Sequence, residues 1–329
     1  MLLKELSYYK TGGTCDQLIE PSSIEELAFA MENIHRDETP YFLLGAGSNS
    51  LIMDGHWPGA VVSLRKMRRI SITRDRILAE AGVDNSEFAS HCLDAALEGA
   101  GWLYGMPGQL GATIRMNARC YGGEIDRIVD SVTVVTAKGE VLVYPAKEVF
   151  RGYKSTLFMS TRDVVAAATF TLKEGDPQRI GEFMRGCKSD REGNFQFLHP
   201  SCGCVFKNDY DVGVPSGFLL EQAAVRRFNT GSVEISPHHA NFVFNKGAST
   251  SQILDVTLKM REAVYRKFGV WLEYEMEVLG IVPHDLKERL REKRPDNYRH
   301  SSLAPLREQF RKGVKKRRMP MHTLHQEFA

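Results

Sequence analysis

Apolar residues fall into short runs and helically spaced sets along most of the chain. Short runs bounded by turn-forming residues predict buried strands at residues 41–44, 59–64, 77–81, 131–136, 141–144 and 164–171. A polar turn at 137–140 joins two of these strands. Strands are interleaved with helical segments, which indicates an α+β fold.

Helical spacing of apolar positions predicts helices at residues 25–33, 88–97 and 253–268. Ser22 and Glu25 have the spacing of a capping box at the start of the first helix. Asn85 or Ser86 can cap the second helix, and Gly269 ends the third.

Turn-forming and charged residues around 173–177 predict a domain boundary. We expect a first subdomain at 1–70, a second at 71–173 joined by a returning strand at 270–280, a third domain at 174–269 and a basic extension at 281–329.

Net charge is +2, but it is unevenly distributed. Residues 285–329 hold 13 Lys or Arg against 6 Asp or Glu, so the remainder of the chain is mildly acidic. The tail has no aromatic residues spaced for base stacking, and we interpret it as a solvated extension, a helix at most, that does not bind nucleic acid.

Composition narrows the class of protein further. No apolar run is long enough for a membrane span, and the N-terminus lacks the apolar segment of a secretory signal, so we expect a cytoplasmic protein. The six cysteines form no CxxC pair, and the histidines lack zinc-ligand spacing. We therefore expect reduced thiols and no bound metal.

Two glycine-rich segments interrupt the regular elements, at 45–50 and at 105–124. Such segments expose backbone N–H groups and let another molecule approach the main chain closely. The first lacks the third glycine of a GxGxxG fingerprint and the Gly-Lys-Ser/Thr ending of a P-loop. Together, the two segments suggest a large diphosphate-bearing cofactor held from two sides.

From residue 9 to about 280 the chain resembles the UDP-N-acetylenolpyruvoylglucosamine reductases of peptidoglycan precursor synthesis. The matching blocks, in order, lie at residues 11–13, 45–51, 105–111, 116–118, 121–124, 152–154, 203–208, 220–223, 239–242, 267–270 and 272–275. The resemblance implies a two-subdomain FAD-binding fold of the vanillyl-alcohol-oxidase (PCMH) type, with a smaller α+β substrate-binding domain.

The same resemblance implies non-covalent FAD, NADPH as co-substrate, a UDP-sugar as substrate, and a monomer that contacts no membrane. It places the cofactor against Gly45, Ala46, Gly47, Ser48, Asn49, Ser50, Pro107, Gly108, Gly111, Asn117, Tyr121, Gly122 and Gly123. It places the substrate against Tyr153 and Asn208, and with less support against Lys207, Gln222, His239 and Asn241. Arg191 lies near the position of a basic residue that assists the UDP diphosphate, but its spacing differs.

The resemblance also implies three catalytic positions. Hydride addition to an enol ether needs positive charge facing the adjacent carboxylate and an acid that protonates carbon. Glu275 matches the family, whereas Lys154 stands where the family has Arg and Cys204 where it has Ser. Lysine keeps the charge but loses the two-pronged fork. Cysteine, with an ordinary pKa near 8.5, is a stronger acid than serine, so Cys204 is the expected proton donor, with Glu275 and Lys154 polarising the carboxylate.

These departures leave two alternatives open. Besides the reductase that the resemblance implies, the chain could be a related FAD reductase with an altered substrate, or a non-catalytic FAD-binding protein whose basic tail engages a partner. Alternating carboxylates at 273, 275 and 277 would also be typical of a solvated strand face.

Overall fold

The computed structural model describes residues 2–293 and 303–316. The chain forms two compact units. The N-terminal unit comprises residues 15–46 and 58–191, and the C-terminal unit comprises residues 2–14, 47–57 and the described residues from 192 onward. The chain divides after 191, not at the expected 173/174, because helix α6 (Pro177–Gly193) buries Ile180 and Met184 in the core of the N-terminal unit.

Two larger sheets form the framework of the N-terminal unit, which confirms the α+β prediction. Their orders are β1-β4-β2 and β11-β10-β12-β6-β5, the second antiparallel throughout. The strands are β1 (Thr14–Ile19), β2 (Tyr41–Leu44), β4 (His56–Ser63), β5 (Ile70–Thr73), β6 (Arg76–Glu80), β10 (Val129–Val135), β11 (Val141–Pro145) and β12 (Val164–Thr171). Short pairs join β7 (Leu97–Glu98) to β13 (Lys173–Glu174) and β8 (Arg119–Cys120) to β9 (Gly123–Glu124). All six predicted strands are present, with their ends shifted by a few residues.

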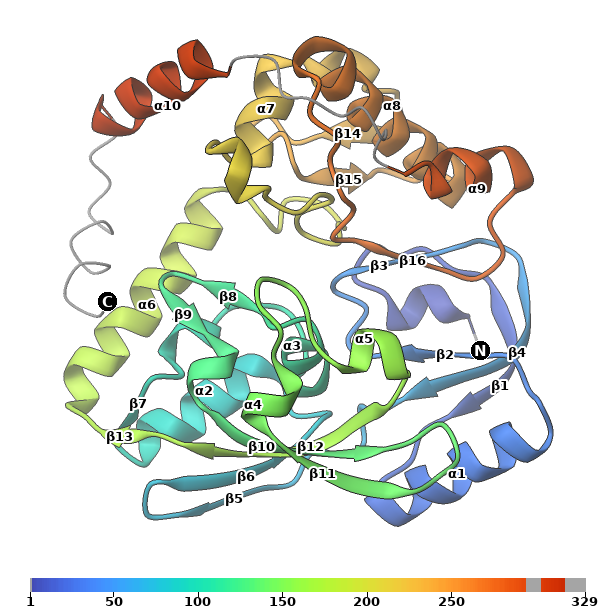
Figure 1. Cartoon of the computed structure of the whole chain (residues 1–329), viewed down its shortest axis with the longest axis vertical. Helices are drawn as coiled ribbons and strands as arrows, with labels where there is room; N and C mark the ends of the chain where they lie inside the picture. The colour runs from blue at the N-terminus through green and yellow to red at the C-terminus, as the bar shows by residue number, and fades with distance from the viewer. Residues whose placement is uncertain (1, 294–302, 317–329) are drawn as a thin grey trace. The chain divides into compact units, whose positions relative to one another are not determined.

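Helices cover both faces of the central strand β12, which explains its continuous apolar run. Val164 and Ala166 share a core with Met31 of α1, whereas Phe170 packs against Phe88 of α2 with ring centroids 4.7 Å apart. The helical elements of the unit besides α6 are α1 (Ile24–Arg36), α2 (Asn85–Asp94), α3 (Leu110–Arg115), α4 (Ala146–Val149), α5 (Phe158–Thr161), η2 (Gly101–Leu103) and η3 (Ile125–Arg127). Figure 1 shows α2, α3 and α4 on one side of the five-stranded sheet.

Two of the predicted helix caps are displaced by one or two residues. Ser23, not Ser22, caps α1 and accepts a hydrogen bond from the Glu26 N–H at 3.2 Å. Asp84 caps α2 by accepting from the Ser86 N–H at 2.8 Å. Asn85 is buried instead, and its side-chain oxygen accepts a hydrogen bond from the Thr113 hydroxyl.

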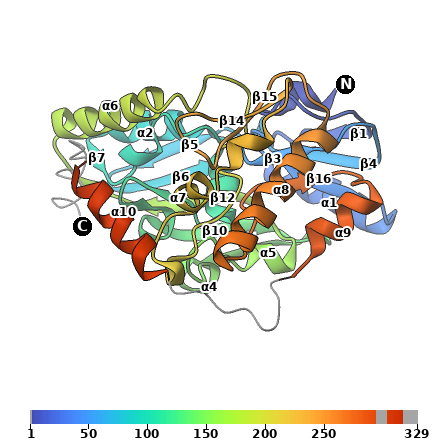
Figure 2. The same ribbon diagram turned by 90° about the horizontal axis from the view of Figure 1, so that it is seen from above.

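The C-terminal unit is built around helix α8 (Thr250–Phe268), which lies beside β14 and β15 (Figures 1 and 2). Ser249 and Gln252 form a capping box, and Gly269 ends the helix with a left-handed φ of +66°, so the third predicted helix is confirmed. The other elements are η1 (Leu3–Leu6), β3 (Ser50–Ile52), η4 (Tyr210–Val212), α7 (Ser216–Gln222), η5 (Val225–Phe228), β14 (Val233–Ile235), β15 (Val243–Asn245), β16 (Glu277–Leu279), α9 (His284–Arg291) and α10 (Ala304–Lys316).

The returning strand pairs elsewhere than expected. β16 runs parallel to β3, with Glu277 opposite Ser50 and Leu279 opposite Ile52, and not beside the strands of 71–173. The buried Leu51 of β3 belongs to the core of the C-terminal unit, to which Val278 also packs. Apolar packing across this pair therefore determines that β16 pairs with β3.

The predicted solvated tail is more ordered than expected within its described residues. Helices α9 and α10 follow β16, and Leu286 and Leu303 are buried in the core of the C-terminal unit. Among residues 2–293 and 303–316, no helix combines the length and hydrophobicity that crossing a membrane requires.

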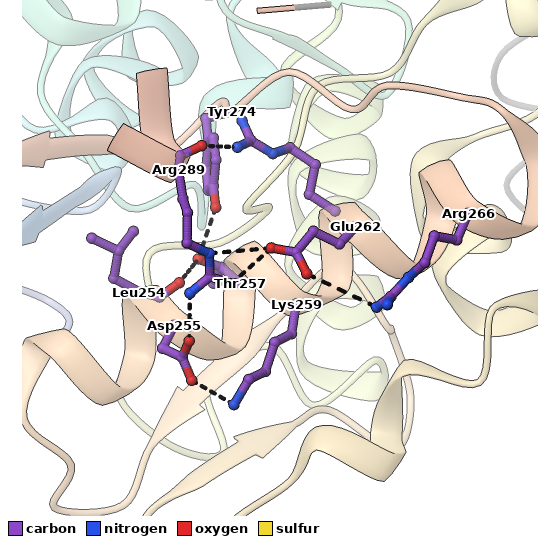
Figure 3. Close-up of polar contacts among 9 residues, drawn as sticks. Leu254, Asp255, Thr257, Lys259, Glu262, Arg266, Tyr274 and Arg289 are labelled. Carbon is purple, nitrogen blue, oxygen red and sulfur yellow. Dashed lines mark hydrogen bonds and ion pairs between the residues drawn. The ribbon is translucent and has the colours of Figure 1, made fainter. Parts of the chain in front are cut away.

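A charged network fastens α9 to α8 (Figure 3). The Arg289 guanidinium donates to Asp255 Oδ1 and Glu262 Oε1, both at 2.8 Å. Hydrogen bonds from Lys259 and Arg289 lower the pKa of Asp255, although partial burial alone would raise it. The Arg289 carbonyl accepts from Arg261, whose guanidinium stacks over the ring of Tyr274 at 5.3 Å.

We expect Arg289→Met to lower the free energy of unfolding at pH 7 by about 1–2 kcal/mol, because the apolar stem is kept but two carboxylates lose a partner. A lowered pKa means that the contribution of Asp255 is present above about pH 4 and is lost as pH falls through its folded-state pKa. The deficit should therefore shrink toward pH 3 in urea unfolding. Arg266→Met is the control, since Arg266 is 69% exposed and 3.9 Å from Glu262; equal losses from both variants would contradict the network.

Candidate active site

Cys204 lies on a short extended segment that is paired on both sides within the C-terminal unit. On one side Cys204 forms a β-bridge with Phe242, and the Val205 N–H donates to the Asn241 carbonyl at 2.9 Å. On the other side the Glu275 N–H donates to the Val205 carbonyl at 2.8 Å. This pairing sets Cys204 and Glu275 on adjacent segments, although they are far apart in the sequence.

The turn before Cys204 separates two thiols with different environments. Gly203 has a left-handed φ of +76°, and a Cβ there would meet no atom of the described residues within 4 Å beyond its chain neighbours, so conformation and not crowding favours glycine. Cys202 is buried and Cys204 is half-buried. Burial, followed by the negative charges of ionised Cys204 and Glu275, raises the pKa of Cys202. Cys202 is therefore a neutral thiol near two of the three predicted catalytic groups, Cys204 and Glu275.

Two predicted ligand contacts hold these catalytic segments in place. Asn241 is 2% exposed, accepts a hydrogen bond from the Phe206 N–H at 3.0 Å and donates to the Phe206 carbonyl at 2.8 Å. The Asn49 amide donates to the Glu275 carbonyl at 2.8 Å. Both side chains thus position the backbone around Cys204 and Glu275, and their direct contact with a ligand stays a prediction.

Lys207 and Asn208 follow Cys204 on a loop that the start of α7 closes. The Lys207 ammonium lies 3.7 Å from the Glu273 carboxylate. Asn208 Oδ1 accepts a hydrogen bond from the Ser216 N–H at 2.9 Å, and the Ser216 hydroxyl donates to the Lys207 carbonyl. Both residues therefore lie on a loop whose two ends are fastened together.

His239 and Gln222 are the remaining predicted substrate contacts in this unit. His239 Nδ1 accepts from the Asn241 N–H at 3.3 Å, and its ring meets Phe242 edge-on at 4.9 Å. Burial lowers the pKa of His239, so the imidazole is neutral at pH 7. Gln222 is the last residue of α7, and its carbonyl accepts a hydrogen bond from Lys267 at 2.6 Å.

The first glycine-rich loop passes from one unit to the other along the chain: Gly45 and Ala46 belong to the N-terminal unit, and Gly47, Ser48, Asn49 and Ser50 to the C-terminal unit. A Cβ on Gly45 would make only ordinary contacts with Ala112 at 3.4 Å and Gln109 at 3.5 Å, so packing does not demand glycine there. Bare backbone at such a point suits the close approach of a ligand. Gly123 differs, because a Cβ would lie 2.1 Å from the Trp102 ring.

The second glycine-rich loop already uses part of its backbone. The Gly108 carbonyl accepts from the Asn85 N–H at 3.1 Å, and the Gly111 N–H donates to the Ala81 carbonyl at 2.9 Å. The amide of Gly111 is therefore occupied by the protein. Pro107 is half-buried immediately before this turn, and its contact with a cofactor stays a prediction.

Asn117 is one of several residues in or beside the second glycine-rich segment that carry buried polar atoms. Its Nδ2 donates to Asp126 Oδ2 at 3.2 Å and to the Gly152 carbonyl at 2.9 Å. Asn117 Oδ1, Asp126 Oδ1 and Gln109 Oε1 are buried and have no hydrogen-bond partner within the described part of the chain. Buried acceptors without donors are rare in native proteins. The isoalloxazine, ribityl and ribose groups of FAD carry N–H and O–H donors, so these residues fit that cofactor.

The carbonyl held by Asn117 belongs to Gly152, immediately before Tyr153 and Lys154. The Arg119 guanidinium lies 4.1 Å above the Tyr153 ring centre. Lys154 has a left-handed φ of +51°. Burial raises the pKa of Cys120, and the charge and hydrogen bond of Arg191, followed by the charge of Lys154, oppose that shift.

Arg191 makes structural contacts within the N-terminal unit, and the diphosphate contact considered from the sequence stays a prediction. It is 4% exposed and donates to the Tyr104 carbonyl at 2.6 Å and the Trp102 carbonyl at 3.1 Å. Its guanidinium also stacks 4.6 Å from the ring centre of Tyr121. The Tyr121 hydroxyl donates to Asp190 Oδ2 at 2.8 Å, and the exposed Gly122 completes the turn between β8 and β9.

Four residues of the site were not predicted from the sequence: Arg119, Asp126 and Ser216, which contact predicted residues, and Gln109, whose buried oxygen has no partner within the described part of the chain. The only available signal was that Gln109, Arg119 and Asp126 lie within or beside the second glycine-rich segment. Asp126 and Ser216 lie nine and eight residues from their partners Asn117 and Asn208, separations that match neither helical nor strand spacing, so the sequence pattern does not reveal these contacts.

Comparison with known proteins agrees with this arrangement. Residues 195–279 match the family described as UDP-N-acetylenolpyruvoylglucosamine reductase, C-terminal domain, and residues 15–144 match an FAD binding domain. The chain is 34% identical over 279 residues to the UDP-N-acetylenolpyruvoylglucosamine reductase of Exiguobacterium sibiricum, covering 84% of this chain and 91% of that protein. The Geobacillus thermodenitrificans enzyme of the same name is also 34% identical, with the same coverage.

A solved structure shows the same fold. The crystal structure of UDP-N-acetylenolpyruvylglucosamine reductase (MurB) from Thermus caldophilus aligns with a TM-score of 0.71 at 28% identity, covering 85% of this chain and 97% of that chain. The matched C-terminal domain ends at residue 279, before α9 and α10. Sequence identity, the matched domains and the fold agree, and the chain belongs to the UDP-N-acetylenolpyruvoylglucosamine reductase family.

Proposed function

We propose that this chain reduces UDP-N-acetylglucosamine enolpyruvate to UDP-N-acetylmuramate, a step of peptidoglycan precursor synthesis. FAD, when bound, supplies the two-electron chemistry by accepting hydride from NADPH and passing it to C3 of the enolpyruvyl group. Gly45, Gln109, Asn117 and Asp126 are the residues of the N-terminal unit that we assign to holding it, on the strength of the bare backbone and the unpaired buried oxygens.

The pairing of the Cys204 segment with the Glu275 segment is the observation that carries this proposal. Reduction at C3 leaves an electron pair at C2 that is delocalised into the adjacent carboxylate. Cys204 donates its thiol proton to C2, and the resulting thiolate regains a proton from solvent before the next turnover. The half-buried position of Cys204 is compatible with both steps.

Charge on the substrate carboxylate must also be stabilised while the proton is transferred. We assign this to Lys154, whose ammonium sits on the segment fixed by the contact of Asn117 with Gly152. Glu275 was expected to polarise the carboxylate with Lys154, but a second negative charge would not stabilise it. We therefore assign Glu275 to assist the proton donor, because the backbone sets it on the segment next to Cys204. Tyr153, Lys207, Asn208, Gln222 and His239 are assigned to the substrate on the family resemblance.

An anaerobic half-reaction experiment tests the proposal. Purified protein should be yellow, lose colour on addition of NADPH, and regain it when the enolpyruvyl nucleotide is added. Bleaching without reoxidation by this nucleotide would favour a related reductase with another substrate. A yellow protein that does not respond to NADPH would favour a non-catalytic flavin-binding role.

We further propose that the protein works as a monomer in the cytoplasm, without a nucleic-acid partner. All six cysteines are free thiols, which is typical of a reducing compartment. Light scattering of the purified protein tests the monomer, for which the chain mass is 37.1 kDa.

A further inference from the structure

Helix α10 lies outside the matched domain, yet it contacts the loop that follows the proposed proton donor. Arg307 Nε donates to the Val212 carbonyl at 2.8 Å, and its Nη2 donates to the Asp211 carbonyl at 3.0 Å. The ring of Phe310 packs against Phe218 of α7 with centroids 5.2 Å apart. The described part of α10 is therefore docked on η4 and α7.

The turn that Arg307 contacts is the middle of the loop 207–216. Asp209 caps it by accepting a hydrogen bond from the Asp211 N–H at 3.0 Å, and Gly213 ends it with a left-handed φ of +72°. The last carbonyls of a short helix have no partner within the helix. Arg307 satisfies two of these carbonyls, those of Asp211 and Val212, from outside the turn.

The ends of the same loop are fastened by Ser216, as described above, through Asn208 and Lys207. Asn208 and Lys207 are thus fixed from one side by α7 and from the other by a turn that α10 holds. The guanidinium of Arg307 suits the contact with this turn, because its rigid fork presents several donors to adjacent carbonyls.

We propose that Arg307 is a positioning residue for the substrate: it keeps the loop 207–216 in the conformation in which Lys207 and Asn208 bind the UDP-sugar. The inference rests on the proposed function for the identity of that ligand. Without Arg307 the loop must be ordered during binding, so substrate affinity falls.

Arg307→Ala should raise KM for the enolpyruvyl nucleotide about tenfold, the size expected for one or two lost hydrogen bonds, and leave kcat within about twofold. Amide hydrogen exchange of residues 209–213 should be faster without nucleotide and return toward wild-type protection when UDP-N-acetylglucosamine is added. Arg307→Lys keeps one donor group and should fall between wild type and Arg307→Ala.

Arg311→Ala is the matched control, because Arg311 is exposed on the same helix and the change removes the same charge. It should leave KM and exchange at wild-type values. Unchanged KM and exchange in both Arg307 variants, or an equal effect of Arg311→Ala, would overturn the inference. Failure of the wild-type enzyme to be reoxidised by the nucleotide would instead refute the proposed function, and hydrogen exchange would still report whether Arg307 fixes the loop.

Discussion

Cys204→Ala should slow reoxidation of the reduced flavin by the enolpyruvyl nucleotide at least about 100-fold, the lower end for loss of a general acid. Reduction by NADPH should keep its wild-type rate, because the thiol takes no part in it. The backbone bridge to Phe242 does not use the side chain, so alanine preserves the pairing that positions Glu275. Stopped-flow absorbance of the flavin separates the two half-reactions.

A second substitution at Cys204 and one at Cys202 test whether the effect is specific to the acidic proton at position 204. Cys204→Ser restores a weaker acid at the same atom and should keep appreciable turnover. Cys202→Ala removes the buried thiol two residues earlier and should leave both half-reactions near wild type. Near-wild-type reoxidation in Cys204→Ala would show that another group protonates C2, and an inactive serine variant that retains FAD would indicate chemistry that requires a thiol.

The sequence predicted the elements of this fold because their causes are local. The apolar run 164–171 gives β12, and the cap at Ser249 with the stop at Gly269 gives α8. The caps of α1 and α2 were misplaced because adjacent residues of the same chemical type competed for one position. At α2 the cap is Asp84, because the side chain of Asn85 is buried and accepts a hydrogen bond from the Thr113 hydroxyl.

The long-range pairings were beyond the sequence patterns. Nothing near Glu277 indicates that β16 pairs with β3, because that choice depends on apolar residues more than two hundred positions away. The packing of the tail was also not predicted, because it too depends on contacts with distant parts of the sequence. Its many charges predict a solvated segment, but buried Leu286 and Leu303, together with partly buried apolar residues such as Phe310, pack its described part against the core.

The candidate site was likewise only partly predictable from the sequence. Resemblance supplied Cys204, Lys154 and Glu275, but it did not supply the side chains that hold them. Asn117 shows this most clearly, because it was predicted as a cofactor contact and is also the residue that fixes the segment before Lys154. A substitution at Asn117 therefore tests cofactor binding and structure together.

Asn117→Asp should lower the free energy of unfolding by about 3 kcal/mol at pH 7 and cause loss of FAD during purification. The new carboxylate replaces a donor with an acceptor that faces Asp126 Oδ2, now 3.2 Å away, and the Gly152 carbonyl, now 2.9 Å away. The backbone is not the cause, since Asp tolerates the left-handed φ of +43° about as well as Asn does. Tryptophan fluorescence in urea and the flavin-to-protein absorbance ratio measure the two effects.

The sign of the pH dependence distinguishes repulsion from simple loss of a hydrogen bond. Two carboxylates that share a site retain one proton to a higher pH than either would alone, so the stability deficit of Asn117→Asp should shrink as pH falls toward about 4. Adding Asp126→Asn restores a donor opposite the new carboxylate and should recover part of the stability at pH 7, while the contact with Gly152 stays repulsive. If Asn117→Asp retains full FAD and unfolds as the wild type does at pH 7, then Asn117 does not hold the segment that carries Lys154, and the assignment of these unpaired oxygens to the cofactor fails with it.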